Sequence, residues 1–498
     1  MKYAISKNNQ IINLKEIPVS STDELRNELI HLCKAGKRVI GFFGCNEANA
    51  VKLYAILAND AKSEFLIFSA YFKKEKSYPS ITKDIPSFHM FEREFYEEFG
   101  IEPIGHPWLK PVRYSKNRFD KTQKIENYPF FKMDGEEVHE VAVGPIHAGI
   151  IEPGHFRFMC NGEKVYHLEI QLGYQHRNIE QLLADNNKFL PHPAESIVGD
   201  TVIGHSTAYS NAIETLLGIE ISNKAGLIRV LALELERIAM HIGDLGAISN
   251  DIAYLMGNAV FGATRTLVIN TFLSLCGNRF GRGLIRVGGV SFDIDNELIE
   301  KISDTLDKVS EDVDRMANTM FSSASVLSRL EKTGTISKEK AHDIGLVGMT
   351  ARASGLPADS RINHPWGYYK DLVLNKELLD SGDVYARAYI RYKEITQSIK
   401  IIRELLCKLP IYDKDVLINK NKNLLSANSM VVSIVEGWRG EIIHTALTDN
   451  QGKIFRYKIK DPSFNNWYGL ALAVRNNGIS DFPLCNKSFN LSYCGNDL

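Results

Sequence analysis

The chain has 498 residues, which is long enough for two or more domains with separate hydrophobic cores. Lys and Arg number 59 against 60 Asp and Glu, and this balance excludes a typical nucleic-acid-binding protein, because phosphate recognition needs a basic excess. The cysteines are scattered, with no pair at metal-ligand spacing, a pattern that suits a reducing cytosol and excludes a disulfide framework. They are Cys33, Cys45, Cys160, Cys276, Cys407, Cys485 and Cys494.

Neither a membrane-spanning segment nor a signal peptide is evident in the sequence. No apolar run reaches the roughly 18 residues that a helix needs to span a bilayer. Residues 1–17 lack the apolar centre of a signal peptide. We therefore expect a chain that is soluble by itself and that other subunits anchor if it works at a membrane.

The first part of the chain alternates helical and strand-like patterns. Residues 22–35 have the apolar spacing of a helix, and residues 38–43 and 64–72 resemble strands. This alternation predicts a small α+β domain over residues 1–113. The polar, irregular sequence that follows, YSKNRFDKTQKIEN, predicts a linker over residues 114–140.

The remainder, residues 141–498, is predicted to form a mainly helical domain with β pieces at both ends. Two strand-like segments, 154–160 and 164–172, flank Asn161-Gly162 and predict a hairpin. Asn223 is a suitable N-cap for a long amphipathic helix. The further predicted elements are helices around 250–276, 297–330 and 384–409 and strands at 430–434 and 441–447.

Eight sequence segments carry a family resemblance. FEREFYEEFGIEPIGHP (91–107) resembles the signature of the small peripheral C subunit of complex I, the NADH-quinone oxidoreductase. Seven further segments resemble, in family order, the D subunit of complex I and its relative, the large subunit of [NiFe] hydrogenases. They are GPIHAGIIEPGHFRF (144–158), LGYQHRNIEQLL (172–183), GHSTAYSNAIETLLG (204–218), ELERIAMHIGDLG (234–246), IRVGGV (285–290), ARASGLPADSR (351–361) and GDVYARAYIRYKE (382–394).

The fusion of both parts in one chain resembles the energy-converting (group 4) [NiFe] hydrogenases. Formate hydrogenlyase and hydrogenase-4 large subunits share that layout. The resemblance implies an α+β fold. A small α/β sandwich domain similar to the C subunit of complex I would be followed by a mainly helical domain similar to the D subunit.

Four positions depart from the hydrogenase pattern together. In the resembling hydrogenases two Cys-x-x-Cys pairs hold the nickel–iron centre, and the matching positions here are Val198, Thr201, Ser492 and Gly495. Valine and glycine side chains cannot bind a metal, and neutral hydroxyls are poor ligands for a centre that prefers thiolates. We therefore expect this chain to bind no metal or other cofactor. Cys494 is either a single displaced thiol or a surface or partner-facing cysteine.

Several ionisable residues remain in the segments that would border the lost metal site. Glu152 matches the glutamate of the Glu-Pro-Gly-His element, which is a proton-transfer candidate in the resembling hydrogenases. Burial could raise its pKa toward neutrality and suit it to relay protons. His176 and Glu180 are four residues apart and are predicted to share a helical face. The proton-relay or cavity-lining candidates are Glu152, His155, Arg157, His176, Arg177 and Asp359.

Each candidate also has a structural interpretation. Glu152 could do no more than pair with Arg157 or Arg177. Arg352, Asp359 and Arg361 could form a buried ion network that holds a loop. The complex I-style quinone grip has no support, because Pro153 (or nearby Glu152) and Gly199 stand where the resemblance would place its histidine and tyrosine.

The resemblance implies a peripheral-arm subunit of a membrane-associated, complex I-like redox complex on the cytoplasmic face of the inner membrane. One partner would be a small protein that is similar to the B subunit of complex I and carries an iron–sulfur cluster. The others would be membrane-arm proteins similar to the H subunit of complex I and to its antiporter-like subunits. Electron transfer to a quinone or another small redox molecule would then be coupled to proton or ion translocation. The alternative is a catalytically inactive connector between the iron–sulfur subunit and the membrane arm.

Overall fold

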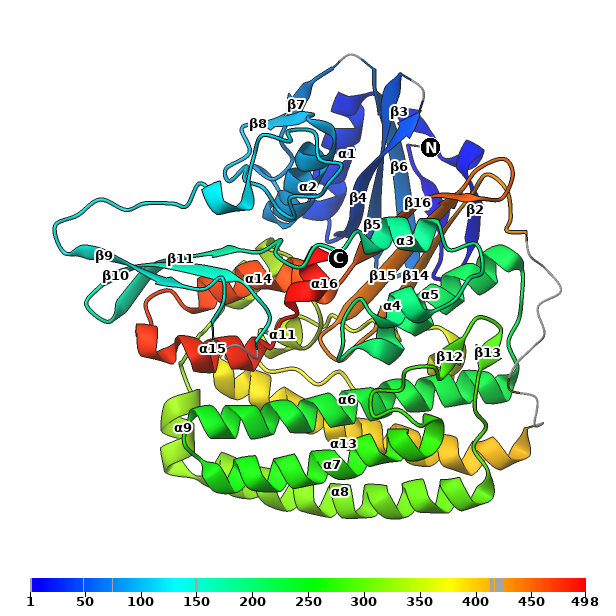
Figure 1. The fold of residues 1–498 in the computed structure, drawn as a ribbon, viewed down its shortest axis with the longest axis vertical. Helices are drawn as coiled ribbons and strands as arrows, with labels where there is room; N and C mark the ends of the chain where they lie inside the picture. The colour runs from blue at the N-terminus through cyan, green and yellow to red at the C-terminus, as the bar shows by residue number, and fades with distance from the viewer. Residues whose placement is uncertain (1, 48, 74, 148–150, 413–415, 417–423) are drawn as a thin grey trace.

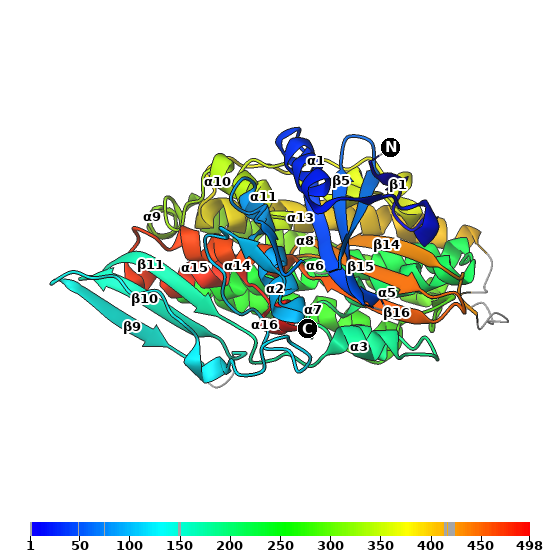
Figure 2. The same cartoon turned by 90° about the horizontal axis from the view of Figure 1, so that it is seen from above.

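The computed structural model describes residues 2–47, 49–73, 75–147, 151–412, 416 and 424–498. Three tiers follow one another along the long axis of the molecule (Figure 1). The N-terminal α+β domain forms one end, a bundle of long helices forms the other, and the C-terminal strands and short helices lie between them. A small sheet projects from one side of the middle tier, as the view from above also shows (Figure 2).

The N-terminal domain is built on a five-stranded sheet with the order β1-β6-β5-β4, and β3 pairs with β6. Helix α1 begins at a capping box in which Ser21 and Glu24 satisfy each other's backbone N–H groups. The predicted helix and strands are present, and β5 was missed. The elements are β1 (Ala4–Ser6), β3 (Val19–Ser20), α1 (Thr22–Lys34), β4 (Arg38–Glu47), β5 (Ala50–Asn59), β6 (Glu64–Phe72), β7 (Ser77–Pro79), α2 (His89–Phe99) and β8 (Glu102–Ile104).

The projecting sheet contains the predicted hairpin. Strands β10 (His155–Asn161) and β11 (Lys164–Gln171) are antiparallel and turn at Gly162, which has φ +55°, a conformation that glycine adopts without strain. Strand β9 (Val138–Val143) adds a third strand along β10. The region predicted as a linker therefore runs into this sheet at its C-terminal end.

Four long helices form the bundle in the described part of the chain. They are α6 (Asn223–Asp251), α7 (Leu255–Cys276), α8 (Asn296–Ser322) and α13 (Val384–Lys408). Helix α6 packs against both α7 and α13, and its N-cap is Ser222 rather than the predicted Asn223. The single helix predicted over 297–330 is two helices, because Ser323 adopts an extended conformation between α8 and α9 (Ala324–Leu330).

Among the helices in the described residues, α7 is long and apolar enough to cross a membrane by length and composition alone. The expectation that no segment reaches this length is wrong, because isolated polar residues such as Asn258 and Asn270 do not lower the apolar character of the whole stretch enough. In the folded chain α7 packs against α6 and α8, and its Phe261, Val268 and Phe272 side chains belong to the main core.

The middle tier contains a four-stranded antiparallel sheet with the order β16-β15-β14-β2. Strands β14 (Ser429–Glu436), β15 (Glu441–Thr448) and β16 (Ile454–Lys460) come from the C-terminal part of the chain. The fourth strand, β2 (Ile11–Asn13), comes from the N-terminal part and pairs with β14. The sheet therefore crosses the predicted domain boundary.

The side chain of Asn8 continues this pairing beyond β2. Its Nδ2 donates to the carbonyl of Ile434 at 3.0 Å, and its Oδ1 accepts from the N–H of Ile434 at 2.9 Å. Helix α5 (Val202–Leu217) covers one face of the sheet, and the N-terminal domain packs on the other.

Short elements complete the structure. They are α3 (Ile179–Ala184), α4 (His192–Glu195), β12 (Ile285–Arg286), β13 (Gly289–Val290), α10 (Lys338–Asp343), α11 (Gly348–Ala353), α12 (Ser360–Asn363), α14 (Pro462–Ala473), α15 (Phe482–Phe489) and α16 (Tyr493–Asp497).

Candidate functional site

The fold brings together the two segments that match the hydrogenase cysteine pairs. Val198 and Thr201 immediately precede α5, and Ser492 and Gly495 lie at the start of α16. A Cβ built on Gly495 would lie 2.8 Å from Cγ2 of Val198 and 2.6 Å from Cγ of Asp461. Segments almost three hundred residues apart therefore meet as the resemblance implies, and the space between them is filled. We call the turns around Val198, Thr201, Ser492 and Gly495 the former cage.

Both hydroxyls of the former cage already have partners. Ser492 caps α16, since its Oγ accepts from the N–H of Gly495 at 2.9 Å. The Oγ1 of Thr201 lies 3.1 Å from Nη1 of Arg439, which also pairs with Asp200 at 2.6 Å. The two hydroxyls therefore serve the local structure.

Cys494 is buried in the former cage, with 7% of its surface exposed. Its sulfur lies 3.3 Å from Oγ of Ser492. Burial and the nearby Glu152 carboxylate raise the pKa of this thiol to about 12. The surface position considered for Cys494 is therefore wrong.

Three of the predicted site residues, Glu152, His176 and Arg177, lie around the C-terminal turn. Glu152 accepts a hydrogen bond from the N–H of Tyr493 at 3.2 Å. His176 contacts the carbonyl of Asp497 through Nδ1 at 2.7 Å. The pKa of Asp497 is raised to about 6 because its carboxyl is buried.

Arg177 joins the two halves of the former cage. Its guanidinium donates to the carbonyls of Ser196 at 2.8 Å and Ile197 at 2.9 Å, just before Val198. Its backbone N–H donates to the carbonyl of Leu498 at 2.9 Å. Arg177 thus holds the backbone before Val198 and the backbone at Leu498 together by hydrogen bonds. The pairing with Glu152 that the sequence left open is not formed.

The prediction that His176 and Glu180 share a helical face is wrong. Helix α3 begins only at Ile179, because Asn178 has a φ of +59°, in the left-handed region. Glu180 instead pairs with Lys458 at 2.9 Å. Burial opposes ionisation of this carboxyl, but the charge of Lys458 outweighs it and lowers the pKa to about 2.

His155 and Arg157 lie on the opposite face of β10 from Phe156, which packs on Tyr493. Arg157 pairs with Glu140 on β9 and lies over the ring of Phe130. His155 packs on the same ring at 4.9 Å, and burial and Arg157 lower its pKa. The fold therefore does not bring these two residues into the former cage. Residues 148–150 of the motif at 144–158 lie outside the described residues.

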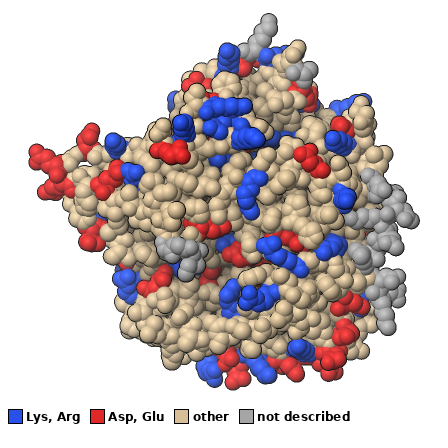
Figure 3. All heavy atoms as spheres, viewed as in Figure 1, with Lys and Arg blue, Asp and Glu red and all other residues tan. Residues whose placement is uncertain are grey.

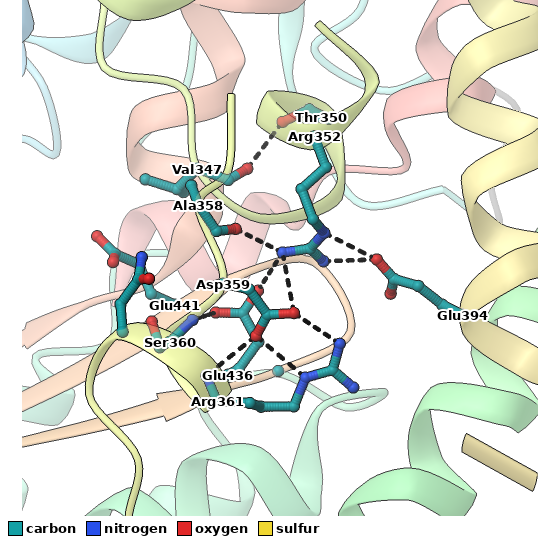
Figure 4. A network of polar contacts seen from close by, with 12 residues as sticks. Val347, Thr350, Arg352, Ala358, Asp359, Ser360, Arg361, Glu394, Glu436 and Glu441 are labelled. Carbon is teal, nitrogen blue, oxygen red and sulfur yellow. Dashed lines mark hydrogen bonds and ion pairs between the residues drawn. The ribbon is translucent and has the colours of Figure 1, made fainter. Parts of the chain in front are cut away.

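Asp359 belongs to a buried ion network with Arg352, Arg361, Glu394 and Glu436 (Figure 4). Arg352 pairs with Glu394 at 2.6 Å and with Glu436 at 2.8 Å, and Arg361 pairs with Asp359 at 2.7 Å. Each of the five residues has 3% or less of its surface exposed. This arrangement matches the structural interpretation of Arg352, Asp359 and Arg361.

The carboxyls of this network differ in pKa. Burial opposes ionisation of Glu394, but Arg352 and a hydrogen bond from His241 outweigh it and place the pKa well below its usual range. Burial raises the pKa of Glu436, with Asp359 adding to the effect. Glu394 and His241 lie on α13 and α6, and sequence analysis missed both. The signal was available, since charged residues recur within long helices whose surrounding residues are apolar.

The network and the former cage share one turn. Residues 437–440 connect β14 to β15, and the turn is closed by hydrogen bonds between Gly437 and Gly440. Glu436 enters the network on one side of the turn, while Arg439 on the other side reaches Thr201 and Asp200. The turn therefore connects the Arg352 ion network to the former cage through four residues of backbone.

A second polar arrangement begins at Asp461 beside Gly495. Asp461 contacts Nε2 of His205 at 3.1 Å, and Nδ1 of His205 contacts Nε2 of His444 at 3.1 Å. The Nδ1 of His444 then contacts the hydroxyl of Tyr457 at 2.8 Å. All four residues have 1% or less of their surface exposed. We call them the Asp–His–His–Tyr chain.

Glu236 is a buried acid on α6 whose side chain reaches the start of α5. It accepts from the N–H groups of Ile203 at 2.8 Å and Gly204 at 3.2 Å, which otherwise lack a partner at a helix N-terminus. Burial raises its pKa to about 8, and Asp200 contributes in the same direction. Such a carboxyl holds a proton at neutral pH.

Two cavities open beside these groups. One, of about 490 Å³, lies between the N-terminal domain and the loops around α10 and α11, with Arg38, Asp60 and His342 among its lining residues. The other, of about 380 Å³, is bordered by α2, α3 and β16. We call the second the polar cavity, because its lining includes Glu94, Glu97, Glu98, Arg113, His176, Glu180, Arg456 and Tyr457.

On the face seen in Figure 3 the charges of both signs are scattered, and acidic side chains gather at the outer end of the projecting sheet. Among the described residues, no group of three or more His, Cys, Asp or Glu side chains could hold a metal ion.

Comparisons with known proteins support one family. The family described as respiratory-chain NADH dehydrogenase, 49 Kd subunit, matches residues 251–497, and the corresponding 30 Kd subunit family matches residues 23–132. Hydrogenase-4 component G of Escherichia coli is 26% identical over 89% of this chain and 80% of that protein. Formate hydrogenlyase subunit 5 of Escherichia coli is 27% identical over 84% of this chain and 77% of that protein.

The D subunit of the NADH-quinone oxidoreductase of Carboxydothermus hydrogenoformans is 31% identical over 69% of this chain and 93% of that protein. Among solved structures, a chain of the archaeal membrane-bound sulfane sulfur reductase shares the fold, with a TM-score of 0.67 and 22% identity over 74% of this chain and all of that chain. The chain thus belongs to the family of the 49-kDa subunit of respiratory-chain NADH dehydrogenase, with a domain of the 30-kDa subunit type fused in front of it.

Proposed function

We propose that this chain is a peripheral-arm subunit of a membrane-associated redox complex related to the energy-converting hydrogenases, and that it works without a [NiFe] centre. It couples electron transfer from a partner iron–sulfur subunit to proton or ion translocation. The membership in the complex I family and the similarity to hydrogenase subunits support the first part. The packing of the former cage supports the second.

The observation that carries the proposal is the close contact of Gly495 with Asp461 and Val198. A ligand thiolate at position 495 would need a Cβ, and that atom would lie 2.6 Å from Cγ of Asp461. Val198 and Gly495 offer no ligand atom, and the hydroxyls of Ser492 and Thr201 are engaged by a helix N-terminus and by Arg439. These residues do not fit a nickel–iron pair.

The proposed partners follow from the family. A protein similar to the B subunit of complex I would carry the iron–sulfur cluster, and proteins similar to its H subunit and its antiporter-like subunits would form the membrane arm. Among the similar proteins is the membrane-bound hydrogenase subunit alpha of Pyrococcus furiosus, 29% identical over 70% of this chain, which supports placement at a membrane. We propose the cytoplasmic face of the inner membrane as the location.

A second candidate function is that of an inactive structural connector. The filled former cage and the completed ion pairs of the Arg352 network favour it, because neither feature requires chemistry. The buried acid–base groups beside the former cage favour an active site. Glu236 holds a raised pKa there, and perturbed carboxyls of this kind cluster at functional sites.

Purification of the native complex tests the proposal. Nickel and iron are measured in the complex, together with hydrogen uptake and with turnover from reduced methyl viologen to decylubiquinone or to polysulfide. Iron without nickel, no hydrogen uptake and turnover with either acceptor are expected. Stoichiometric nickel with hydrogen turnover would overturn the proposal, and no turnover with any acceptor would favour the connector.

Glu152→Gln then examines proton transfer by this residue. Glu163→Gln is the matched control, because Glu163 is an exposed glutamate at the turn of the hairpin that follows Glu152. Loss of turnover in an intact complex, with the control unchanged, supports a role in proton transfer. Unchanged turnover in Glu152→Gln refutes it.

A further inference from the structure

The Asp–His–His–Tyr chain connects the former cage to the polar cavity. Asp461 lies against Gly495 in the former cage, and Tyr457 is one of the residues that line the polar cavity. His205 and His444 bridge the two ends through contacts of 3.1, 3.1 and 2.8 Å. We propose that these four residues form a path that carries protons between the polar cavity and the former cage.

The hydrogen bonds of the path have a single consistent direction. Because Asp461 is a carboxylate, it accepts, and Nε2 of His205 carries the proton. The Nδ1 of His205 then accepts from Nε2–H of His444, and Nδ1 of His444 accepts from the Tyr457 hydroxyl. Each interior group both donates and accepts, which is the arrangement that successive proton transfer requires.

The transfer balances without any change in heavy-atom bonds. A hydronium ion in the polar cavity gives a proton to the Tyr457 oxygen as the hydroxyl proton moves to Nδ1 of His444. The proton on Nε2 of His444 moves to Nδ1 of His205, and the proton on Nε2 of His205 moves to Asp461. One carboxylate is neutralised, and both rings end as the opposite tautomer. When Asp461 exchanges its proton at the former cage before the reverse transfer, Nε2 of His205 receives a new proton as both rings are restored.

The electrostatic surroundings favour a neutral His444 ring and an ionised Asp461. Burial and the neighbouring His205 place the pKa of His444 well below its usual range. Burial opposes ionisation of Asp461, but His205 outweighs it and lowers the pKa of the carboxyl, and Arg439 acts in the same direction. At the other end, burial places the pKa of Tyr457 well above its usual range, with Tyr209 and Glu180 adding to the effect.

The backbone amides of α5 provide a slow reference rate against which proton exchange along the path can be compared. His205 lies within α5, whose residues are buried between the sheet and the bundle. Backbone amides of α5 exchange with solvent deuterium only when the helix opens. A ring proton of His205 can exchange faster than these amides only through a route that does not need such opening.

The test is hydrogen–deuterium exchange of the His205 Nε2 proton in the full chain, labelled with 15N-histidine and followed by NMR. In the wild-type chain this proton should exchange faster than the α5 amides. Tyr457→Phe should slow it by about tenfold or more, toward the rate of the amides. Tyr54→Phe is the matched control, since Tyr54 is also fully buried but lies in the N-terminal domain, and it should leave the rate unchanged.

Two outcomes overturn the path. One is a His205 ring proton that exchanges no faster than the α5 amides in the wild-type chain. The other is a folded Tyr457→Phe variant with an unchanged rate. A coupling between the nitrogens of His205 and His444 across their hydrogen bond is expected in the same samples, and its absence would also contradict the geometry.

The use of the path in turnover rests on the proposed function, whereas the exchange measurement does not. In the native complex Tyr457→Phe should lower turnover from reduced methyl viologen by about a hundredfold, the usual effect of removing a proton-transfer group, and Tyr54→Phe should not. A complex without any turnover contradicts the proposed function and leaves the exchange result standing. Fast turnover by Tyr457→Phe contradicts the role of the path.

Discussion

The carboxylate of Asp461 occupies the space into which any side chain at Gly495 would have to project, with 2.6 Å between its Cγ and a Cβ at that position. Asp461 cannot retreat easily, because it also caps α14 and contacts His205. This relationship makes the former cage sensitive to the smallest possible side chain.

Gly495→Ala should therefore destabilise the chain by about 1–3 kcal/mol, the usual cost of overpacking a buried site. Chemical denaturation of the variant measures the free energy of unfolding. Gly199→Ala is the control, because a Cβ at Gly199 has no heavy atom within 4 Å. Equal stability of the two variants would show that the former cage accommodates a methyl group at position 495.

Glu394→Gln should lower the free energy of unfolding by about 3–5 kcal/mol, because it leaves Arg352 buried without its main counter-charge. The folded-state pKa of Glu394 lies below its unfolded value. Its contribution is therefore complete above the unfolded pKa of about 4.3 and is lost as pH falls further. Denaturant titrations at neutral and acidic pH measure both effects.

Glu404→Gln serves as the control for Glu394→Gln. Glu404 lies on the same helix, α13, but is exposed and pairs with Lys408 one turn away. Its loss should change stability by no more than about 0.5 kcal/mol. A similar effect of both substitutions would indicate that the Arg352 network does not depend on the charge of Glu394.

Glu236 should hold a proton at neutral pH and lose it near pH 8. Its folded-state pKa lies above its unfolded value, so this group's contribution makes the chain less stable as pH rises from about 4.5 toward 8. Infrared spectroscopy of the folded chain should show a protonated carboxyl band that disappears between pH 7 and 9. The band should be missing from Glu236→Gln, and a band that persists in this variant belongs to another acid.

Cys407 should be the one thiol that reacts rapidly with Ellman's reagent at pH 8 in the folded chain. It is exposed, and the other six cysteines are buried. Burial and Glu152 raise the pKa of Cys494 to about 12, so that only a small fraction of this thiol is in the reactive thiolate form at pH 8. Cys407→Ser should abolish the fast phase, whereas a fast phase that survives this substitution would place a second thiol at the surface.

Elements with local signals could be predicted from the sequence. The capping box at Ser21 and Glu24 marks the start of α1, and Asn161-Gly162 marks the turn between β10 and β11. The family motifs likewise predicted that Val198 and Gly495 would meet. Local signals failed where one residue changes the geometry, as at Asn178, whose left-handed conformation separates His176 from α3.

Relationships that depend on strand register could not be predicted. His444 and Tyr457 are separated by 13 residues and come together only because β15 and β16 pair Ala446 with Tyr457. His205 then meets His444 because α5 crosses this sheet. No spacing in a single sequence encodes such a crossing, so the Asp–His–His–Tyr chain became visible only in three dimensions.

The pairing of β2 with β14 has a consequence for synthesis. Ile12 leaves the ribosome early, while its partner Met430 is made only after more than 400 further residues. Until then β2 has an open edge, and exposed strand edges invite pairing with other chains. The middle sheet can close only after β14 has emerged, so nascent chains stalled before residue 429 should be prone to aggregate.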